Sequence, residues 1–497
     1  MMQALPEDAR QAQQLLQPLS SDLAASYFHE VVGNLGETVE VRLASLEKGR
    51  GVFATKDFAE EDLIFKEPPL VGAQHTSNRA NALVCSHCFS FIGSIGIQIA
   101  HRLLSRRDAE PVDVNPDYLR SLWSGVAELP YSNRFPLRTL VTCLGGCTDS
   151  IYCSEECAAA NWAAHHQLLC CGRRAQPSSV MPPAETEQQQ RRSSFEAFRE
   201  SRERLQTQGL HSLTPPIRRE PPNFDKADAI RLFREHADET NDAFHIAAQV
   251  VAGTLLRADE LLINNSTPGS TGSSRERSWA ALQHAWRPYA AAWKAPWWEC
   301  VAIPEDVTDA HAFRSDLREL ASDSLELLKA FLYDERFPGL FHLDVYGSIV
   351  GMFELNNLDL FVASPVEDYF ELCHGEDSSL SAEEQHLTQL TTRPLLDALG
   401  KAYDAACEGS AFYALQSCCN HSCAPSAYAF KRAHIDTDGS AVVLAKRSIA
   451  CGEEVCLSYI DEDAPFHERR AALADYGFVC ACEKCAAEAA APGKAAA

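Results

Sequence analysis

The spacing of the cysteines constrains this chain more than any other feature of its sequence. Among 497 residues, 19 are cysteine, and most of them fall into short groups between residues 85 and 171 or near the C-terminus. The first ten residues carry Glu7 and Asp8 and no apolar stretch, so no secretory signal is predicted. In a reducing compartment disulfides are rare, and closely spaced thiols are typical of metal sites. The sequence therefore predicts bound metal rather than a disulfide framework.

Four pairs of candidate metal ligands follow one another in the first cysteine-rich region. The pairs are Cys85 and Cys88, Cys143 and Cys147, Cys153 and Cys157, and His166 and Cys170. Seven thiols and one imidazole are the ligand set of two tetrahedral zinc ions. The neighbours His165 and Cys171 are alternative ligands. Buried free thiols are the other explanation, but they would require four correctly spaced pairs to arise by chance.

A second group of candidate ligands lies near the C-terminus. Cys480, Cys482 and Cys485 supply three thiolates, and Cys423 is the obvious fourth ligand for a third zinc ion. Cys423 ends the string Asn420-His421-Ser422-Cys423, which is followed by Gly452-Glu453-Glu454 and then by Tyr459. The tetrapeptide alone is a weak signal. The tetrapeptide becomes a specific signal when these later residues and the three C-terminal cysteines follow it in this order.

The overall composition excludes several classes of protein. Lys and Arg total 44 against 69 Asp and Glu, a formal net charge of −25, which argues against a broad nucleic-acid-binding surface. No run of 18 apolar residues predicts a membrane span. No Gly-x-Gly-x-x-Gly lies between a strand and a helix, which disfavours a Rossmann-type enzyme. The acidic surface suits a basic partner, although solubility is its commoner explanation.

Patterns of apolar residues predict strands at both ends of the chain and helices between them. Val39, Val41 and Leu43 alternate with polar residues as in a half-buried strand, and Lys48–Gly51 is a predicted turn. Asp438-Gly439 is a hairpin signal, and strand character returns from Val345. Further strands are predicted at 52–54, 63–65, 428–430, 441–444 and 455–459. Helices are predicted within 1–30 and at 244–255, 278–294 and 309–333, whereas 101–136 reads as a polar, irregular insertion and 264–270 as a loop.

Together these motifs resemble the SET and MYND domain-containing protein-lysine methyltransferases over nearly the full length of the chain. Tyr152–Cys157, with Trp162 and His166, looks like a MYND zinc finger, and the C-terminal motifs look like a SET domain with a post-SET zinc site. Longer strings are similar to the plant trithorax-related and animal branches of that family. They are Gln74–Asn78, Trp297–Cys300, Gly351–Leu360, Ser364–Tyr369 and Gln416–Cys423.

The resemblance implies an α+β fold. A SET-domain β-fold with a pseudoknot would be split by a MYND zinc finger and a helical insertion, and a cysteine-rich post-SET zinc site would follow. The implied boundaries are an N-terminal extension at 1–30, the N-terminal part of SET at 31–84, the finger with its insertion at 85–171, a linker at 172–222, the helical insertion at 223–340, the C-terminal SET core at 341–463, the post-SET segment at 464–488 and a frayed tail at 489–497.

The resemblance also groups the metal ligands, because the pairs of a MYND finger interleave. One ion would be held by Cys85, Cys88, Cys153 and Cys157, and the second by Cys143, Cys147, His166 and Cys170. The third would be held by Cys423, Cys480, Cys482 and Cys485. All three ions would be structural, because methyl transfer needs no metal at the reacting atoms.

The activity that the resemblance implies is methyl transfer from S-adenosyl-L-methionine to the ε-amine of a histone lysine. Tyr459 would be the catalytic hydroxyl at the transfer site. Residues implied in cofactor binding are Lys48, Gly49, Arg50, Gly51, Asn356, Asn420, His421, Tyr459 and Phe478. Asn357 is the alternative to Asn356, and Tyr476 either joins Phe478 in the wall of the site or packs in the core.

The implied partners are a histone or another basic protein as substrate and a Pro-rich peptide at the finger. No sequence-specific nucleic-acid binding and no membrane are expected, and the location is the nucleus, with the cytoplasm as a second possibility. Two alternatives stay open: a methyltransferase of a non-histone basic protein such as a ribosomal protein, and a non-catalytic adaptor. Arginines at 191–192, 204 and 218–219 are either a localisation signal or solvated charge.

Overall fold

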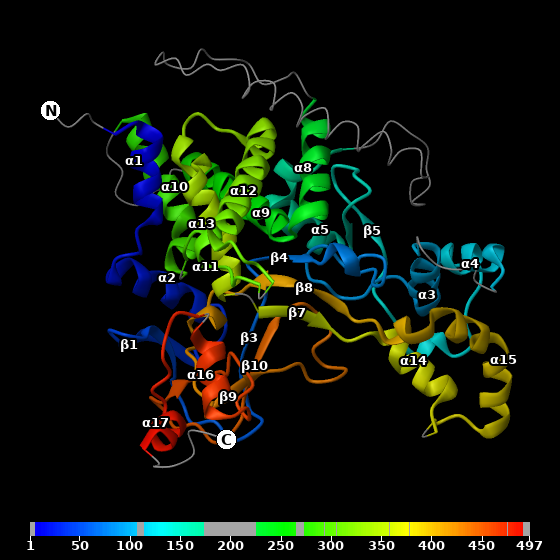
Figure 1. The fold of residues 1–497 in the computed structure, drawn as a ribbon. Helices are drawn as coiled ribbons and strands as arrows, with labels where there is room; N and C mark the ends of the chain where they lie inside the picture. The colour runs from blue at the N-terminus through cyan, green and yellow to red at the C-terminus, as the bar shows by residue number, and fades with distance from the viewer. Residues whose placement is uncertain are drawn as a thin grey trace.

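The computed structural model describes residues 5–106, 114–172, 225–264 and 273–490, apart from residues 293, 305, 357, 377 and 475. In this part of the chain, several short sheets lie between a large group of helices on one side and the C-terminal helices on the other, with further helices at one end (Figure 1). The predictions for the linker at 173–222 with its arginines, for the loop residues 265–270, for Asn357 and for the tail beyond residue 490 lie outside the described residues.

The strands are short and come from both ends of the chain. They are β1 (Val39–Ser45), β2 (Gly49–Ala54), β3 (Leu63–Glu67), β4 (Val71–Gln74), β5 (Val141–Thr142), β6 (Ile151–Tyr152), β7 (Leu358–Val362), β8 (Cys407–Phe412), β9 (Ala427–Ala429), β10 (Ala441–Ala445) and β11 (Glu454–Val455). Strands β5 and β6 pair with each other, and the rest form three sheets of mixed origin.

Each of these three sheets joins an N-terminal strand to a C-terminal one. Their orders are β1-β2-β11, β3-β10-β9 and β4-β8-β7, and all pairs are antiparallel. Val52 lies opposite Val455, and Phe65 lies opposite Val443. Because each sheet needs both halves, the region before the finger and the region after residue 358 must fold together.

Helices make up most of the remaining described chain. They are α1 (Glu7–Leu16), α2 (Ser21–Gly33), α3 (Ile95–Leu104), α4 (Pro116–Trp123), α5 (Glu155–Asn161), α6 (Gln167–Leu169), α8 (Lys226–Thr240), α9 (Ala243–Ile263), α10 (Ser274–Ala291), α11 (Trp297–Cys300), α12 (Ala310–Leu332), α13 (Leu343–Asn356), α14 (Pro365–His374), α15 (Ala382–Leu399), α16 (Phe466–Ala474) and α17 (Glu483–Ala490). A π-helical turn, Trp162–His166, links α5 to α6.

Helices α9, α10 and α12 confirm the three helices predicted in the middle of the chain. The apolar stripe of α9 is buried, and α10 begins at a capping box of Ser273 and Glu276. These helices are called the helical body below. The N-terminal extension is helical and packs on them, because the Trp286 indole donates to the Leu15 carbonyl at 2.9 Å. Among the described residues, no helix combines the length and apolarity needed to span a membrane.

The strand predicted from Val345 is wrong, because the segment forms α13. Val345, Tyr346, Ile349, Val350 and Phe353 are all buried in the main core of the helical body. A helix buried on nearly all sides produces a continuous apolar run, and periodicity alone does not separate such a run from a buried strand. Asn356 therefore ends a helix, and the strand next to it begins only at residue 358.

Several smaller expectations also differ from the structure. Leu43 is 60% exposed, since β1 leaves the core at a bulge between Leu43 and Ser45. Strand β2 already begins at Gly49, inside the predicted turn. Strands β9 and β10 pair as predicted, but an eleven-residue loop joins them, so Asp438-Gly439 is not a tight hairpin turn. The insertion within 101–136 is not wholly irregular, because α4 packs there with α3.

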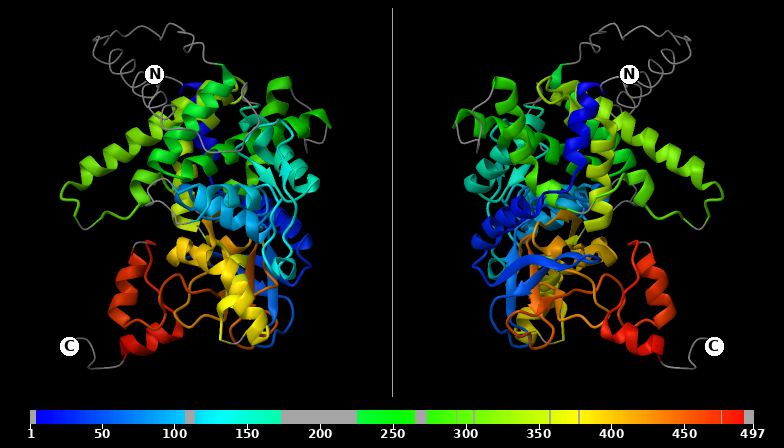
Figure 2. Two further views of the ribbon diagram at one scale, coloured as in Figure 1. Left: turned by 90° about the vertical axis from the view of Figure 1, so that its right-hand side faces the viewer. Right: turned by 90° about the vertical axis from the view of Figure 1, so that its left-hand side faces the viewer.

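The C-terminal segment lies to one side of the sheets, away from the helical body (Figure 2). Helix α16 and helix α17 form it, with a small buried cluster of Cys423, Leu473 and Cys485. The neighbouring sheets have a core of their own that includes Val52, Val443 and Leu457. The segment therefore depends on few apolar contacts.

Candidate active site and metal centres

The first group of thiols lies where the two halves of the finger meet. The sulfur atoms of Cys85, Cys88, Cys153 and Cys157 all lie within 4.8 Å of one another. Cys153 Sγ is 3.6 Å from Cys88 Sγ and 3.4 Å from Cys157 Sγ. The Ser154 hydroxyl caps α5 by accepting from the Cys157 amide at 3.2 Å, which fixes the last ligand pair on the first helical turn.

The second group gathers Cys143, Cys147, His166 and Cys170, again within 4.8 Å. His166 Nε2 lies 3.2 Å from Cys143 Sγ and 3.4 Å from Cys147 Sγ. The Cys171 thiol, one of the two alternative ligands, contacts the Asp149 carboxylate at 3.3 Å instead. The structure thus brings together the interleaved sets, with His166 and Cys170 rather than their neighbours.

The third group joins Cys423 to Cys480, Cys482 and Cys485 across the C-terminal segment. Cys423 Sγ is 3.5 Å from Cys485 Sγ and 4.0 Å from Cys480 Sγ. Arg469 was not predicted as part of this group; its side chain is 2% exposed, lies 3.9 Å from Cys485 Sγ and pairs with Glu488. A buried cation beside thiolates stabilises their charge.

The chemistry of these donor sets fits zinc. Hydrogen bonds from Cys85, Ser90 and Cys153 lower the pKa of the Cys88 thiol to about 4, against the effect of burial. At Cys482, burial is outweighed by the Cys485 amide and neighbouring thiols, and the pKa falls to about 7. Thiolates packed this closely repel one another unless a cation lies between them, and zinc accepts four such ligands in a tetrahedron.

Tyr459 is held against the Asn420–Cys423 string by two hydrogen bonds. Its amide donates to His421 Nδ1 at 3.1 Å, and its hydroxyl donates to the Cys419 carbonyl at 2.6 Å. Next to it, the Leu457 amide donates to the Asn420 carbonyl at 3.0 Å. His421 and Leu457 also form an isolated parallel β-bridge. Burial raises the pKa of the Tyr459 hydroxyl above its ordinary value, so the side chain is a neutral phenol at pH 7.

His421 links Tyr459 to the third group of thiols. Burial lowers the pKa of His421 to about 4, so the ring is neutral at pH 7. Because Nδ1 accepts from the Tyr459 amide, the ring proton is on Nε2, which lies 3.2 Å from Cys423 Sγ. The imidazole can therefore donate to the Cys423 sulfur, which is one of the four candidate metal ligands of the third group.

Aromatic rings surround the hydroxyl of Tyr459 on the side of the C-terminal segment. The ring centroid of Tyr476 is 5.3 Å from that of Tyr459, and the ring of Phe478 is 6.5 Å away. Phe478 also lies 5.9 Å from the ring of His421. Tyr476 and Phe478 are 37% and 38% exposed, so both rings retain free surface next to the site.

The Lys48–Gly51 segment approaches the same string from the opposite side. Asn420 Nδ2 donates to the Arg50 carbonyl at 2.9 Å and to Glu454 Oε1 at 2.7 Å. A Cβ on Gly51 would lie 2.6 Å from Glu454 Oε1 and 3.0 Å from Asn420 Nδ2, so a larger residue here would displace the Glu454 carboxylate from its contact with Asn420. Gly49 has a φ of +73°, which also favours glycine. Glu454, from a motif to which the sequence assigned no role, organises the contact.

The two cations of this segment have different partners. Lys48 Nζ pairs with Glu454 Oε2 at 3.1 Å, and this bond raises the pKa of Lys48 although burial opposes the shift. The Arg50 guanidinium instead reaches the Ala291 carbonyl at the end of α10. Its Nε is buried and has no partner among the described residues. A buried guanidinium nitrogen without a partner fits a bound ligand that carries an acceptor.

Asn356, the remaining predicted cofactor residue, lies at the C-terminal end of α13. Its side-chain amide donates to the Met352 carbonyl one turn earlier, at 2.8 Å. Strand β7 follows and pairs with β8, which leads toward the Asn420 string. Asn356 thus ends a helix, although strand character had been predicted from Val345 onward.

Glu67 is a functional candidate that the sequence reading missed. Its carboxylate is 4% exposed and accepts from the amides of Leu415 at 2.8 Å and Gln416 at 3.0 Å, just before the Asn420 string. Burial raises its pKa to about 7, although those amide bonds oppose the shift. Its place two residues after Phe65, in register with the apolar side chains of the run Leu63-Ile64-Phe65, was the available signal.

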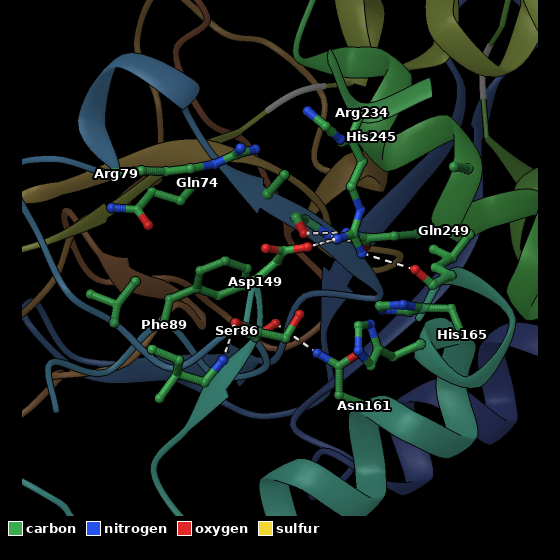
Figure 3. Close-up of a pocket in the computed structure, with 18 of the residues that line it drawn as sticks. Gln74, Arg79, Ser86, Phe89, Asp149, Asn161, His165, Arg234, His245 and Gln249 are labelled. Atoms are coloured by element: carbon green, nitrogen blue, oxygen red, sulfur yellow. Dashed lines mark hydrogen bonds and ion pairs between the residues drawn. The ribbon is translucent and has the colours of Figure 1, made fainter. Parts of the chain in front are cut away.

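A cavity of about 270 Å³ lies elsewhere, between the finger, β4 and helices α8 and α9. Figure 3 shows Asn161 and His165 on one side of it and Arg79 on the other, with the Asp149–Arg234 ion pair between them. None of the predicted cofactor residues lines this cavity. The cavity is therefore separate from the surroundings of Tyr459.

Comparison with known proteins assigns a family to this arrangement. The SET domain model matches residues 49–460. The chain is 39% identical over 504 residues to the histone-lysine N-methyltransferase ATXR2 of Arabidopsis thaliana, with 95% of each chain covered. It is 26% identical over 471 residues to the human protein-lysine N-trimethyltransferase SMYD5, covering 92% of this chain and 89% of the relative.

Proposed function

The chain belongs to the SET-domain family, and from this premise we propose that it is a protein-lysine N-methyltransferase acting on a histone. The observation that carries the proposal is the geometry at Tyr459. A partly buried neutral hydroxyl, oriented by the Cys419 carbonyl at 2.6 Å, lies beside the Asn420 string and two partly exposed aromatic rings. This arrangement can position a lysine amine without any charged catalytic group.

The reaction requires a neutral amine. Free lysine has a pKa of about 10.4, so removing its proton at pH 7.4 costs about 4 kcal/mol. The rings of Tyr459, Tyr476 and Phe478 would exclude water from the lysine side chain, and desolvation disfavours the ammonium form. The neutral amine is thus produced by its surroundings rather than by a general base among these residues.

Tyr459 would then orient the amine. Its hydroxyl donates to the Cys419 carbonyl, so the lone pairs of the oxygen can accept a hydrogen bond from the lysine amine. Holding the reacting atoms in line is worth roughly 7–11 kcal/mol in favourable cases. The bond from the Tyr459 amide to His421 Nδ1 fixes the backbone that carries this hydroxyl.

S-adenosyl-L-methionine, when bound, would supply the methyl group. The residues of this chain that fit it are Asn420, His421, Arg50 and Gly51, with Phe478 as an aromatic wall. The close packing at Gly51 and the orphaned Nε of Arg50 support this placement. We assign Lys48 to Glu454 rather than directly to the cofactor, and we retain Asn356 as a weaker candidate.

We assign one zinc ion to each of the three thiol groups. The two groups of the finger correspond to a MYND-type finger, and the third corresponds to a post-SET site. Structural zinc contributes about 10–16 kcal/mol of apparent folding free energy in small zinc domains. Such a contribution would explain how the C-terminal segment stays folded on a buried cluster as small as Cys423, Leu473 and Cys485.

The substrate is proposed to be a histone because the plant relative named above is a histone-lysine methyltransferase. A net charge of −25 suits any basic protein and does not favour histones over ribosomal proteins. A histone substrate would locate the enzyme in the nucleus. A Pro-rich peptide at the finger is retained as a candidate partner.

The direct test is methyl transfer with the full chain. Purified protein, radiolabelled S-adenosyl-L-methionine and core histones are expected to give labelled histone lysines, and Tyr459→Phe should abolish the label. Ribosomal proteins form the second arm, and label there alone would replace the histone by another basic substrate. A chain that binds the cofactor and labels neither set would not be the proposed enzyme, and failure to bind it would favour the adaptor.

A further inference from the structure

Each of the two groups that consist of four thiols has an arginine beside one of its sulfur atoms. In the first group, Arg138 Nη1 lies 3.5 Å from Cys153 Sγ. In the third group, Arg469 Nη2 lies 3.9 Å from Cys485 Sγ. The two arginines come from unrelated parts of the chain, Arg138 from the loop before β5 and Arg469 from α16.

The second group, in which His166 takes the place of one thiol, has no such arginine among the described residues. Arg234 approaches it, but its guanidinium bonds to Asp149 and Cys171, neither of which belongs to the group. Four thiolates around a divalent cation carry a net charge of about −2, whereas three thiolates and a neutral imidazole carry about −1. The arginines thus accompany the two groups with the larger excess of negative charge.

Arg469 differs from Arg138 in burial, and burial decides how much its charge is worth. The Arg138 side chain is exposed, so water screens its interaction with the thiol group. The Arg469 side chain is buried beside Cys485, which is itself buried. A buried charge is unfavourable unless an opposite charge compensates it. The Arg469 guanidinium and the thiolates of the third group would each supply the charge that the other lacks.

The contacts of Arg469 allow two explanations of its role. Its Nη1 donates to the Ala464 carbonyl at 2.6 Å, and its Nη2 bonds to the Glu488 carboxylate as well as approaching Cys485. Cys485 and Glu488 lie one turn apart on α17. Arg469 could therefore compensate the charge of the thiolates, or it could simply hold α17 against α16 through Glu488.

We propose that Arg469 is a positioning residue for the third metal group, and that its charge, rather than its pairing with Glu488, keeps the four thiolates together around zinc. This inference rests on the zinc assignment made under the proposed function. Cys423 belongs to the group and lies 3.2 Å from His421, which accepts from the Tyr459 amide. The charge of Arg469 would thus support the geometry of the Tyr459 site through the metal group.

The expected effect of removing the charge is selective. Losing a residue that supports a metal ligand typically weakens metal binding about 10- to 100-fold. Arg469→Gln should therefore weaken one of the three zinc ions about 10- to 100-fold and leave the two ions of the finger unchanged. Arg469→Lys restores the positive charge without the planar fork of donors, so it should recover much of the loss.

The experiment is competition for zinc between the full chain and a chromophoric chelator, with total zinc counted by elemental analysis. Arg470→Gln is the matched control, because Arg470 is the exposed neighbour on the same helix and lies over the same Phe466 ring, at 5.6 Å against 5.9 Å for Arg469. It should leave all three ions unchanged. Cys485→Ser identifies the weakened ion, since Arg469→Gln should have no further effect in that background.

Glu488→Gln separates the two explanations. It keeps the charge of Arg469 and removes the ion pair, so the unaltered protein and Glu488→Gln should hold all three ions equally well. If Arg469 only holds α17 against α16, Glu488→Gln should instead weaken one zinc ion as much as Arg469→Gln does, and the proposal would be wrong. This comparison decides the question even if Arg469→Gln does not fold.

Two further outcomes would overturn the proposal. An Arg469→Gln protein that holds all three ions as tightly as the unaltered protein would remove Arg469 from the metal group. Equal weakening of all three ions would mean a general loss of stability. Absence of zinc from this group in the unaltered protein would be a different result, because it would refute the zinc assignment itself. Methyl transfer by the unaltered protein tests the enzymatic function separately.

Discussion

The finger and the C-terminal segment use the same ligand chemistry in different surroundings. The finger thiols are embedded among buried apolar residues that include Leu83, Ile92, Tyr152 and Ile230, the last from helix α8 of the helical body. In the C-terminal segment, Leu473 is the buried apolar residue that accompanies Cys423 and Cys485. The finger is thus part of a large core, whereas the C-terminal segment has few apolar contacts and would depend mainly on the zinc proposed for its thiols.

The two regions also differ in their relation to Tyr459. The C-terminal group touches it through one residue, because His421 lies 3.2 Å from Cys423 and accepts from the Tyr459 amide. The finger instead packs its π-helical turn, Trp162–His166, against α9. The comparison shows that similar thiol groups can stabilise the fold in one region and hold the Tyr459 site in place in another.

The largest expected effect is on catalysis, whereas the finger and the C-terminal segment should both stay folded. Tyr459→Phe should lower kcat about 1000-fold, roughly 4 kcal/mol, because one oriented hydroxyl at a reacting centre is lost. Zinc content and melting temperature should not change, as measured by elemental analysis and calorimetry. Tyr428→Phe is the control, since that exposed hydroxyl only binds Glu61. Normal turnover of Tyr459→Phe would remove the hydroxyl from the mechanism.

The next effect should appear in stability alone. Cys147→Ser removes a ligand that is 3% exposed inside the finger core, and the free energy of unfolding should fall by about 3–5 kcal/mol. The folded fraction should keep kcat within about threefold, because the finger has no contact with Tyr459 through its ligands. Urea denaturation and initial rates measure the two quantities. Cys300→Ser, outside every thiol group, should cost no more than about 1 kcal/mol.

A substitution in the C-terminal thiol group should instead lower the activity at Tyr459. Cys485→Ser disrupts the C-terminal group and is expected to lower kcat/KM about 10- to 100-fold, because His421 loses its metal-bound neighbour. The main unfolding transition should move by less than about 1 kcal/mol, since few apolar contacts join this segment to the body. A loss of global stability as large as that of Cys147→Ser would erase the distinction between the regions.

The smallest effect concerns Glu67, the residue of β3 whose carboxylate accepts from the backbone just before the Asn420 string. Burial raises the pKa of Glu67 to about 7 from an ordinary value of 4.5, so its stabilising contribution is complete below about pH 4.5 and is lost as pH rises through 7. Between pH 5 and pH 8 the unaltered protein should lose roughly 2 kcal/mol of stability that Glu67→Gln retains. Denaturation curves at both pH values test this, and parallel losses would contradict it.

Local patterns were sufficient for the parts of the molecule whose spacing has a direct chemical meaning. The ligand pairs such as Cys153 and Cys157 could be read because both residues lie on one short turn. Helix α9 was predicted because its apolar stripe repeats every three to four residues. Helix α13 was not, because burial on nearly all sides removes the periodic contrast between a helix and a strand.

The sequence by itself determined the candidates for the chemistry: the twelve clustered ligands, the Asn420–Cys423 string and Tyr459. Only the tertiary structure decided how they are connected. The pairing of Lys48 with Glu454, the hydrogen bond from the Leu415 amide to the buried Glu67 carboxylate and the bond from Arg50 to the Ala291 carbonyl all join residues more than 200 positions apart. Spacing along the chain encodes neighbours on one turn or strand, whereas contacts across such distances depend on how whole sheets and helices pack.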